Sequence, residues 1–388
     1  MVTIDASRVF QPELLGTKAR ISLKNNQVLA LGNQPKGLCH LDASRYDLVP
    51  GFIDLQINGA FGFDFTTEPD SLWMTGSRLP ELGITTCLPT IVTSPVEVVE
   101  RAIEVWRVGK PDDYRGTALE GLHLEGPFIN PLKKGAHRVA FMRQPDLSLI
   151  ESWTTENGVR MVTLAPELPE SIKLIEALKQ RGIIVSAGHS MADVDQAWAG
   201  FAAGISHATH LFNAMTPVSH HAPGLAIAVL DDPGISFGLI IDGLHVAPEI
   251  VRLVWKSAGH ERLISLTDAM AGLGMPDGVY DLADMQVTVA EQSARLADGT
   301  LAGSVLTPAQ ALKNLQVFTG CSLEEALHGW TVNPARILGL SHKGTLKPGA
   351  QADIVLLSEE GEVAATFIAG ELVYQATWAE LSWKVLES

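Results

Sequence analysis

Two apolar patterns alternate along the middle of the chain. Short apolar runs, typical of buried parallel strands, occur at residues 119–124, 182–185 and 263–266. Between such runs, apolar residues recur with helical spacing, most clearly at residues 95–107, 170–181 and 192–203. Strands that alternate with amphipathic helices in this way predict an α/β fold, a TIM-like (β/α)₈ barrel over residues 51–340.

The two ends of the chain have a different pattern, of short strands separated by turns. Near the N-terminus, apolar stretches at 8–10, 19–23 and 27–31 flank turn formers such as Asn25 and Asn26. Similar stretches recur near the C-terminus, at 352–357, 364–368 and 371–374. Each end is too small to form a secure core alone. We therefore expect residues 1–50 and 341–388 to pair into one small β-sandwich domain.

Polar residues that could bind a metal ion or take part in catalysis follow the predicted barrel strands. Glu125 comes after the run at 119–124, His189 after the run at 182–185, and Asp268 after the run at 263–266. His210 follows another short segment between them. The carboxyl ends of the strands of a (β/α)₈ barrel meet at one face, so these four side chains are predicted to share one site.

Glu125, His189 and His210 make a donor set of two nitrogens and one oxygen. A lone histidine is usually structural, but this set leaves a fourth position for water, as in catalytic zinc sites. A bound metal would also offset the cost of burying the Glu125 carboxylate between apolar residues. His207 is a rival ligand, although on a strand its side chain would point away from that of His210. Asp268 is placed to act as the general base and acid beside the metal.

Composition and charge narrow the class of protein. The chain has 388 residues, of which 46% are hydrophobic, enough for a large core and a smaller domain. A net charge of -16 argues against nucleic acid or a membrane surface as the main partner. No apolar run is long enough to span a bilayer. The three scattered cysteines imply no disulfide framework and favour a cytoplasmic protein.

Seven motifs lie in order along the chain. They are PGFIDLQING at 50–59, HLEGP at 123–127, KKGAH at 133–137, SAGHS at 186–190, ATHLFNAM at 208–215, DGLH at 242–245 and TDA at 267–269. Together with NPAR at 333–336, this series resembles the N-acetylglucosamine-6-phosphate deacetylases of the amidohydrolase superfamily. The resemblance covers essentially the whole chain.

The resemblance implies roles for particular residues. Glu125, His189 and His210 match the metal ligands of that family, and Asp268 matches its catalytic acid and base. The other implied residues bind the substrate: His137 contacts the acetamide carbonyl beside Ala136, Asn213 and Ala214 hold the sugar phosphate with His245, and Leu301, Ala302 and Gly303 form a loop over the sugar. The implied reaction releases acetate from N-acetyl-D-glucosamine 6-phosphate, in a homodimer.

Two departures from related sequences matter. Many amidohydrolases carry His-x-His at the end of the first barrel strand, where this chain has Gln56 and Asn58. Amides are poor zinc ligands beside imidazole, so we expect one divalent metal ion per subunit. Zn²⁺ is our first choice, and Fe²⁺ or Co²⁺ suit the same donors. His221 stands where the resemblance leads us to expect an arginine that reaches the phosphate from a neighbouring subunit, and histidine is a weaker phosphate ligand. Either the phosphate is bound more weakly here, or Lys133, Lys134 or another residue takes the place of the arginine.

Two alternatives stay open. One is an amidohydrolase that acts on a related compound, such as N-acetylgalactosamine 6-phosphate, an unphosphorylated N-acetyl sugar or an N-acyl amino acid. The other is a non-catalytic amidohydrolase-like assembly protein. Proteins of that second kind typically lack metal ligands, whereas Glu125, His189, His210 and Asp268 are all present here.

Overall fold

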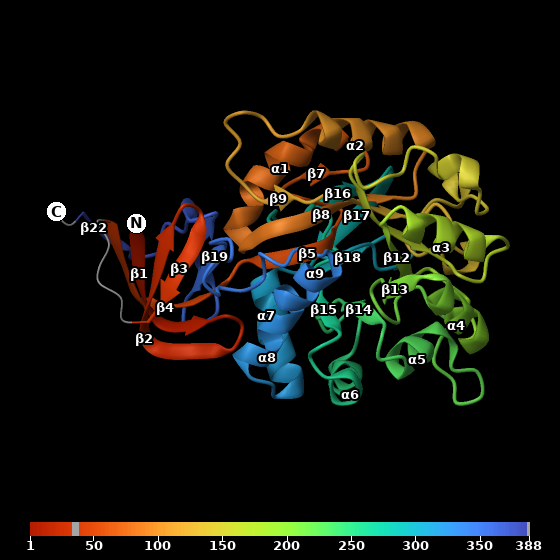
Figure 1. The fold of residues 1–388 in the computed structure, drawn as a ribbon. Helices are drawn as coiled ribbons and strands as arrows, with labels where there is room; N and C mark the ends of the chain where they lie inside the picture. Colours follow the sequence, from red (N-terminus) through yellow and green to blue (C-terminus); the bar gives the residue numbers. More distant parts are fainter. Residues whose placement is uncertain (33–38, 386–388) are drawn as a thin grey trace.

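A parallel barrel built from the middle of the chain lies beside a sheet built from both chain ends (Figure 1). The computed structural model describes residues 1–32 and 39–385. The barrel strands are, in hydrogen-bonded order, β5 (Phe52–Ile57), β8 (Ile84–Val92), β10 (Leu122–Glu125), β11 (Val159–Leu164), β12 (Ile184–Ala187), β13 (Ile205–Ala208), β14 (Ser236–Leu239) and β15 (Leu263–Ser265). A short strand, β9 (Ala118–Leu119), pairs with β8.

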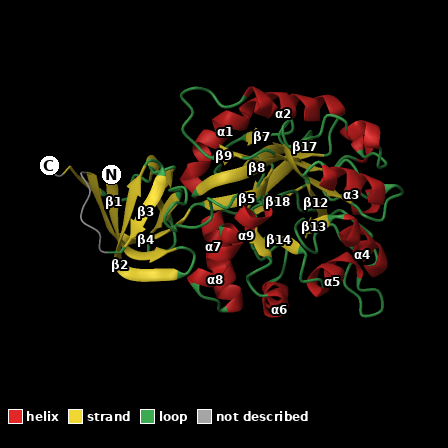
Figure 2. Cartoon of the chain, in the orientation of Figure 1, coloured by secondary structure: helices red, strands yellow, loops and turns green. Residues whose placement is uncertain are grey.

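Helices surround these strands (Figure 2). They are α1 (Leu72–Arg78), α2 (Val96–Val108), α3 (Ser171–Gln180), α4 (Val194–Ala203), α5 (Gly224–Asp231), α6 (Pro248–Ala258), α7 (Pro308–Thr319), α8 (Leu323–Leu327) and α9 (Val332–Ile337). The start of α4 shows how local sequence sets a boundary: Asp193 Oδ1 accepts the Gln196 N–H at 2.8 Å, and Gln196 Oε1 accepts the Asp193 N–H at 3.0 Å. The predicted (β/α)₈ class is confirmed, and α2, α3 and α4 lie where helical spacing predicted them.

The barrel closes through the segment that follows β15. The Asp268 N–H donates to the Gln56 carbonyl at 3.0 Å, and the Asn58 N–H donates to the Ala269 carbonyl at 2.7 Å. Ile57 and Ala269 form a parallel bridge between them. The first strand and the last are therefore joined at the carboxyl-end face, where the predicted site residues lie.

Smaller strands extend the barrel at that face. They are the hairpin β6 (Gly59–Ala60) with β7 (Phe63–Asp64), and the antiparallel sheet of β16 (Gly278–Leu282), β17 (Met285–Ala290) and β18 (Ser293–Arg295). Arg138 forms an ion pair with Asp284 at the β16–β17 turn, with 2.5 Å between Nε and Oδ1. The loop after β10 is thus tied to the small sheet.

The two chain ends form one continuous sheet. Its strands are β1 (Val2–Phe10), β2 (Leu14–Lys24), β3 (Gln27–Leu31), β4 (Cys39–Pro50), β19 (Ile354–Leu357), β20 (Val363–Ile368), β21 (Glu371–Gln375) and β22 (Ser382–Val385). Strand β4 joins the ends, because it pairs with β1 on one side and with β19 on the other. This sheet has its own apolar cluster, separate from the barrel core. The boundaries proposed at residues 50 and 340 stay a prediction, and residues 386–388 lie outside the described chain.

No helix among the described residues is long and apolar enough to cross a bilayer.

A buried ion pair connects the C-terminal tail to the barrel. Lys343 Nζ lies 3.0 Å from Asp353 Oδ2 and 3.1 Å from Thr86 Oγ1 on β8. Both charged side chains are at most 5% exposed. Asp353 Oδ1 also accepts the Ala369 N–H at 2.8 Å, so this carboxylate holds two parts of the tail together. Removal of one charge would leave the other buried without its partner.

We expect Lys343→Met to lower the free energy of unfolding by about 3–5 kcal/mol, because the Asp353 carboxylate stays buried and unpaired. Urea unfolding measures this change. The double variant Lys343→Met with Asp353→Asn should recover part of the loss, and Lys347→Met, at an exposed site nearby, serves as the control. A loss no larger than that of Lys347→Met would contradict a stabilising role for the pair of Lys343 and Asp353.

Candidate active site

One cavity of about 400 Å³ opens at the carboxyl ends of the barrel strands. It brings together most of the residues expected to act on a substrate. The predicted residues that line it are Glu125, Ala136, His137, His189, His210, Asn213, Ala214, His245, Asp268, Leu301 and Gly303. Segments far apart in sequence therefore meet in one place, as the strand-end argument predicted.

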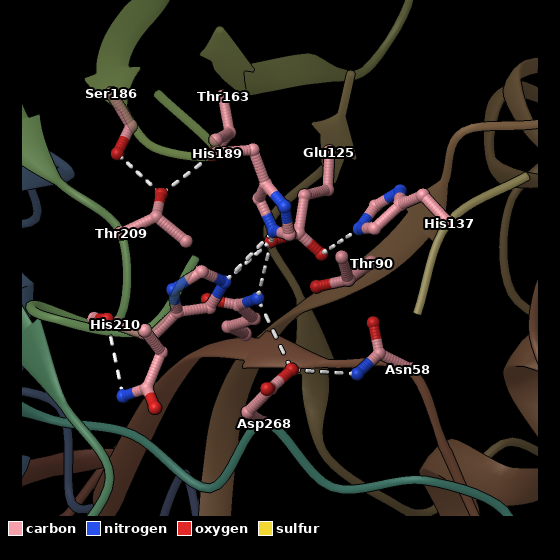
Figure 3. Close-up of polar contacts among 12 residues, drawn as sticks. Asn58, Thr90, Glu125, His137, Thr163, Ser186, His189, Thr209, His210 and Asp268 are labelled. Atoms are coloured by element: carbon pink, nitrogen blue, oxygen red, sulfur yellow. Dashed lines mark hydrogen bonds and ion pairs between the residues drawn. The ribbon is translucent and has the colours of Figure 1, made fainter. Parts of the chain in front are cut away.

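Three side chains converge at the floor of this cavity (Figure 3). Glu125 Oε1 lies 3.2 Å from His189 Nε2 and 2.9 Å from His210 Nε2, and the two nitrogens are 3.2 Å apart. Glu125 ends β10, while His189 comes two residues after β12 and His210 two residues after β13. All three are buried. This is the only group of three or more such donors found among residues 1–32 and 39–385.

The donor set fits a divalent metal ion. The Lys133 carbonyl accepts a hydrogen bond from His189 Nδ1 at 2.8 Å, which puts the proton on Nδ1 and leaves the Nε2 lone pair facing Glu125 and His210. A carbonyl partner of this kind is typical of metal-binding histidines. Two imidazole nitrogens and one carboxylate oxygen then converge, with the remaining side facing the cavity.

Backbone conformation at the site is unusual. His189 has a φ of 49°, His210 of 26° and Asp268 of 48°, all in the left-handed region that residues with a Cβ seldom adopt. Each such residue costs of order 1–3 kcal/mol and persists only where the surrounding fold imposes it. Each of these three candidate site residues thus has a strained backbone just after its strand.

The buried charges shift several pKa values. Burial alone would raise the pKa of Glu125, but the contacts that this carboxylate makes with His137, His189 and His210 hold its pKa well below the usual range. Burial would lower the pKa of His210, and its bond to Glu125 outweighs that effect and raises it. Burial, with the neighbouring His189, lowers the pKa of His137 to about 4, so His137 is neutral near pH 7.

His137 is oriented by Thr93. The Thr93 N–H donates to His137 Nδ1 at 3.3 Å, and Thr93 Oγ1 lies 3.0 Å from the same nitrogen. The N–H donated to Nδ1, with the Glu125 carboxylate on the side of Nε2, favours the tautomer that carries its proton on Nε2. His137 Nε2 lies 3.6 Å from Glu125 Oε2, the contact drawn in Figure 3, and His137 lines the cavity. The ring is therefore a neutral hydrogen-bond donor next to the triad.

Asp268 is held by two amides. Asn58 Nδ2 donates to Asp268 Oδ1 at 2.8 Å, and Gln56 Nε2 donates to the same oxygen at 3.1 Å (Figure 3). Gln56 Nε2 also donates to Glu125 Oε1 at 3.1 Å. Burial, followed by the charge of Glu125, raises the pKa of Asp268 to about 6. One amide group therefore links the triad to the candidate base.

Sequence reasoning used Gln56 and Asn58 only as evidence against a second metal. Their donor role was missed, although a signal existed. Residues two apart on a strand project to the same face, so both amides had to point inward if either did. The partner of His245 was also missed: Asp242 Oδ2 lies 2.6 Å from His245 Nδ1, which leaves the other ring nitrogen for the cavity.

Three residues from the sequence analysis lie elsewhere. His221 is exposed in the loop before α5, with its ring stacked on His220 at 3.9 Å between centroids, and does not line the cavity of its own chain. Ala302 is buried between two cavity residues. His207, the rival ligand, bonds Ser236 Oγ at 3.1 Å rather than the triad.

Known proteins are similar to this chain in sequence and in fold. The amidohydrolase family model matches residues 48–373. Among curated relatives, the N-acetylglucosamine-6-phosphate deacetylase of Homo sapiens is 40% identical over 344 residues, covering 85% of this chain and 84% of its own. The deacetylase of the same name from Bacillus subtilis is 37% identical over 334 residues, with 84% of each chain covered.

Two solved structures of similar fold are also N-acetylglucosamine-6-phosphate deacetylases. An aspartate-to-alanine mutant of the Mycobacterium smegmatis deacetylase, in complex with N-acetyl-D-glucosamine-6-phosphate, has a TM-score of 0.89 and 34% identity, covering 96% of this chain and 99% of its own. The Pasteurella multocida deacetylase has a TM-score of 0.90 and 31% identity over similar shares. The chain belongs to the amidohydrolase family and, within it, to the N-acetylglucosamine-6-phosphate deacetylases.

Proposed function

We propose that this protein hydrolyses N-acetyl-D-glucosamine 6-phosphate to D-glucosamine 6-phosphate and acetate. The observation that carries the proposal is the joining, in one cavity, of a convergent donor triad, a held carboxylate and a neutral imidazole donor. These are groups that serve metal-assisted amide hydrolysis. The family membership of the chain supports the choice of substrate.

Glu125, His189 and His210 would hold one divalent metal ion, and we propose Zn²⁺. When bound, the ion supplies a Lewis acid that polarises the amide carbonyl and lowers the pKa of water. A second ion has no place beside the first, because the amides of Gln56 and Asn58 donate N–H groups to the carboxylates. An N–H that donates to an anion occupies the direction from which a cation would approach.

Asp268 would accept the proton of the attacking water and return it to the departing amine. Both amide donors bond Oδ1, and no described residue bonds Oδ2, so Oδ2 is the oxygen available for proton transfer. The amine leaves as a neutral group only if it is protonated, because an amide nitrogen is a poor leaving group. One fixed carboxyl thus serves both steps.

His137 would bind the acetamide carbonyl. Its Nε2–H faces the cavity, and the low pKa of the ring keeps it a neutral donor. As water attacks, negative charge grows on the carbonyl oxygen, and a fixed donor stabilises that charge more than it stabilises the substrate. Thr93 would thereby act on the reaction through the orientation of His137.

The remaining contacts concern the sugar. We propose that Asn213, Ala214 and His245 hold the phosphate end, and that Ala136 with Leu301, Ala302 and Gly303 encloses the ring. His221 would approach from a neighbouring subunit, in a cytoplasmic homodimer. Because His221 lies outside the cavity of its own chain, hydrolysis of an unphosphorylated N-acetyl sugar is the second candidate.

Acetate release distinguishes these candidates. The purified protein would be assayed with N-acetylglucosamine 6-phosphate, N-acetylgalactosamine 6-phosphate and N-acetylglucosamine, with metal content measured on the same sample. We expect strong preference for the first compound and about one metal ion per chain. Equal rates on the two glucosamine compounds would move the substrate to the unphosphorylated sugar.

The metal ligands make a separate prediction. His189→Ala should lower bound metal from about one ion per chain to a small fraction of that, since only two donors remain. Elemental analysis measures the metal, and circular dichroism checks the fold. His207→Asn is the matched control, and it should keep its metal. If only His207→Asn lost its metal, His207 and not His189 would be the metal ligand.

Replacement of the candidate base tests the proton transfer. Asp268→Asn should lower kcat by roughly 10³-fold, in the range of general acid–base contributions, while the metal stays bound. Steady-state kinetics and elemental analysis on one preparation measure both quantities. Wild-type turnover in this variant would exclude Asp268 from the chemistry.

The raised pKa of Asp268 predicts the acid side of the pH profile. The base must be ionised, and its pKa is about 6, so kcat/KM should fall as the pH drops below that value. The residual activity of Asp268→Asn should lack this fall. A pH profile of wild type and variant measures the difference, and an identical acid limb in both would assign it to another group.

A further inference from the structure

Positive charge is scarce around the cavity. Its wall includes the carboxylates Glu125, Asp268 and Asp298. Lys133 and Lys134 are the only lysine or arginine side chains that line it in the part of the chain that the structure describes. In a protein with a net charge of -16, a cationic side chain on the cavity wall would favour an anionic substrate.

The two lysines differ in what surrounds them. Lys134 is exposed and acts on Asp298 at the cavity mouth, where the pKa of that carboxyl is lowered first by the Thr300 N–H and to a smaller extent by the Lys134 charge. Lys134 therefore offsets a carboxylate of the protein itself. Its Nζ also lies 3.3 Å from the Gly135 carbonyl.

Lys133 has no such partner. Its side chain is half-buried, and its ammonium makes no hydrogen bond or ion pair within residues 1–32 and 39–385. Its backbone is nevertheless fixed, because the Lys133 carbonyl accepts the His189 Nδ1–H at 2.8 Å. A fixed backbone beside the triad and an unpaired ammonium on the cavity wall are what a ligand for a substrate anion requires.

The other candidates in the same chain are less suited. His245 already faces the carboxylate of Asp242, which lies 2.6 Å from its Nδ1 and cancels much of any charge that the ring carries. His221 is outside the cavity. Neither supplies a permanent positive charge, whereas a lysine ammonium is charged at all pH values near neutrality.

We propose that the Lys133 ammonium binds the 6-phosphate of the substrate within its own chain and sets the preference for phosphorylated over unphosphorylated sugar. This proposal rests on the proposed function. The half-buried position strengthens the ion pair relative to one in bulk water, and each ammonium proton can donate to a phosphate oxygen. Lys133 thus serves the site twice, through its carbonyl on His189 and through its ammonium on the substrate.

The test replaces the charge and keeps the backbone. Lys133→Met retains the carbonyl that orients His189 and a stem of similar length. We expect KM for N-acetylglucosamine 6-phosphate to rise roughly tenfold or more, with kcat and bound metal near wild type. Activity on N-acetylglucosamine should change little. Lys133→Arg should restore most of the phosphate preference.

Three comparisons make the result decisive. Lys110→Met removes an exposed lysine that does not line the cavity and should leave both activities unchanged. Lys134→Met should have a smaller effect on KM than Lys133→Met. An equal loss on both sugars in Lys133→Met, or a selective loss only in Lys134→Met or His221→Ala, would overturn the proposal.

A binding measurement separates this proposal from the proposed function. Calorimetry with glucosamine 6-phosphate and glucosamine reports the contribution of the phosphate without turnover. Wild-type protein that binds the phosphorylated sugar more tightly, with that gain lost in Lys133→Met, would support the role of Lys133 even if deacetylation were absent. Active wild-type enzyme whose phosphate preference survives in Lys133→Met would refute the role of Lys133 and leave the function intact.

Discussion

The arrangement of polar groups at the cavity depends on one buried carboxylate, that of Glu125. Glu125 is 3% exposed, and an isolated charge at such a depth would be very costly. The protein surrounds it with polar groups instead: Gln56 donates to Oε1, the Nε2 atoms of two imidazoles lie within 3.2 Å of Oε1, and His137 approaches Oε2. These partners come from β5, from the loops after β12 and β13, and from the loop after β10. Segments far apart in the sequence must therefore come together in the folded barrel before Glu125 has all of its partners.

Closure of the barrel places the base in the same way. The backbone bonds that join Gln56 and Asn58 to Asp268 and Ala269 complete the ring of strands. The side chains of Gln56 and Asn58 then reach Asp268 Oδ1. Below them, a buried polar layer continues the network, in which Thr163 bonds both His123 and Thr209. Burial lowers the pKa of His123 to about 4, so this layer holds a neutral ring rather than a second charge.

Much of this arrangement could be predicted from the sequence, because strand ends are local features. Glu125, His189 and Asp268 each follow an apolar run, and parallel strands in a barrel bring such positions together. Lys133 was a candidate phosphate ligand from the sequence, but the contacts of Thr93 with His137 and of Lys133 with His189 could not be predicted in that way. Each of these two residues contacts a histidine in a loop far away in sequence. The effect of the contact depends on which of the two ring nitrogens it reaches. The loops carry no periodic signal that would fix such geometry. The buried pair of Lys343 and Asp353 was missed for a similar reason, since lysine is seldom buried and nothing in the local sequence marks the exception.

Gln56 on β5 shows how an amide can support two neighbouring carboxylates. A histidine at position 56 would offer a lone pair to a second ion between Glu125 and Asp268. Gln56 instead offers two protons on one nitrogen, and both carboxylates accept them. A neutral group thereby supports two anions that would otherwise repel each other, and it leaves their remaining oxygens free for other partners. Fixed N–H dipoles take the place of the positive charge that a second cation would supply. They bind no exchangeable ion, and the strand that carries Gln56 fixes their position.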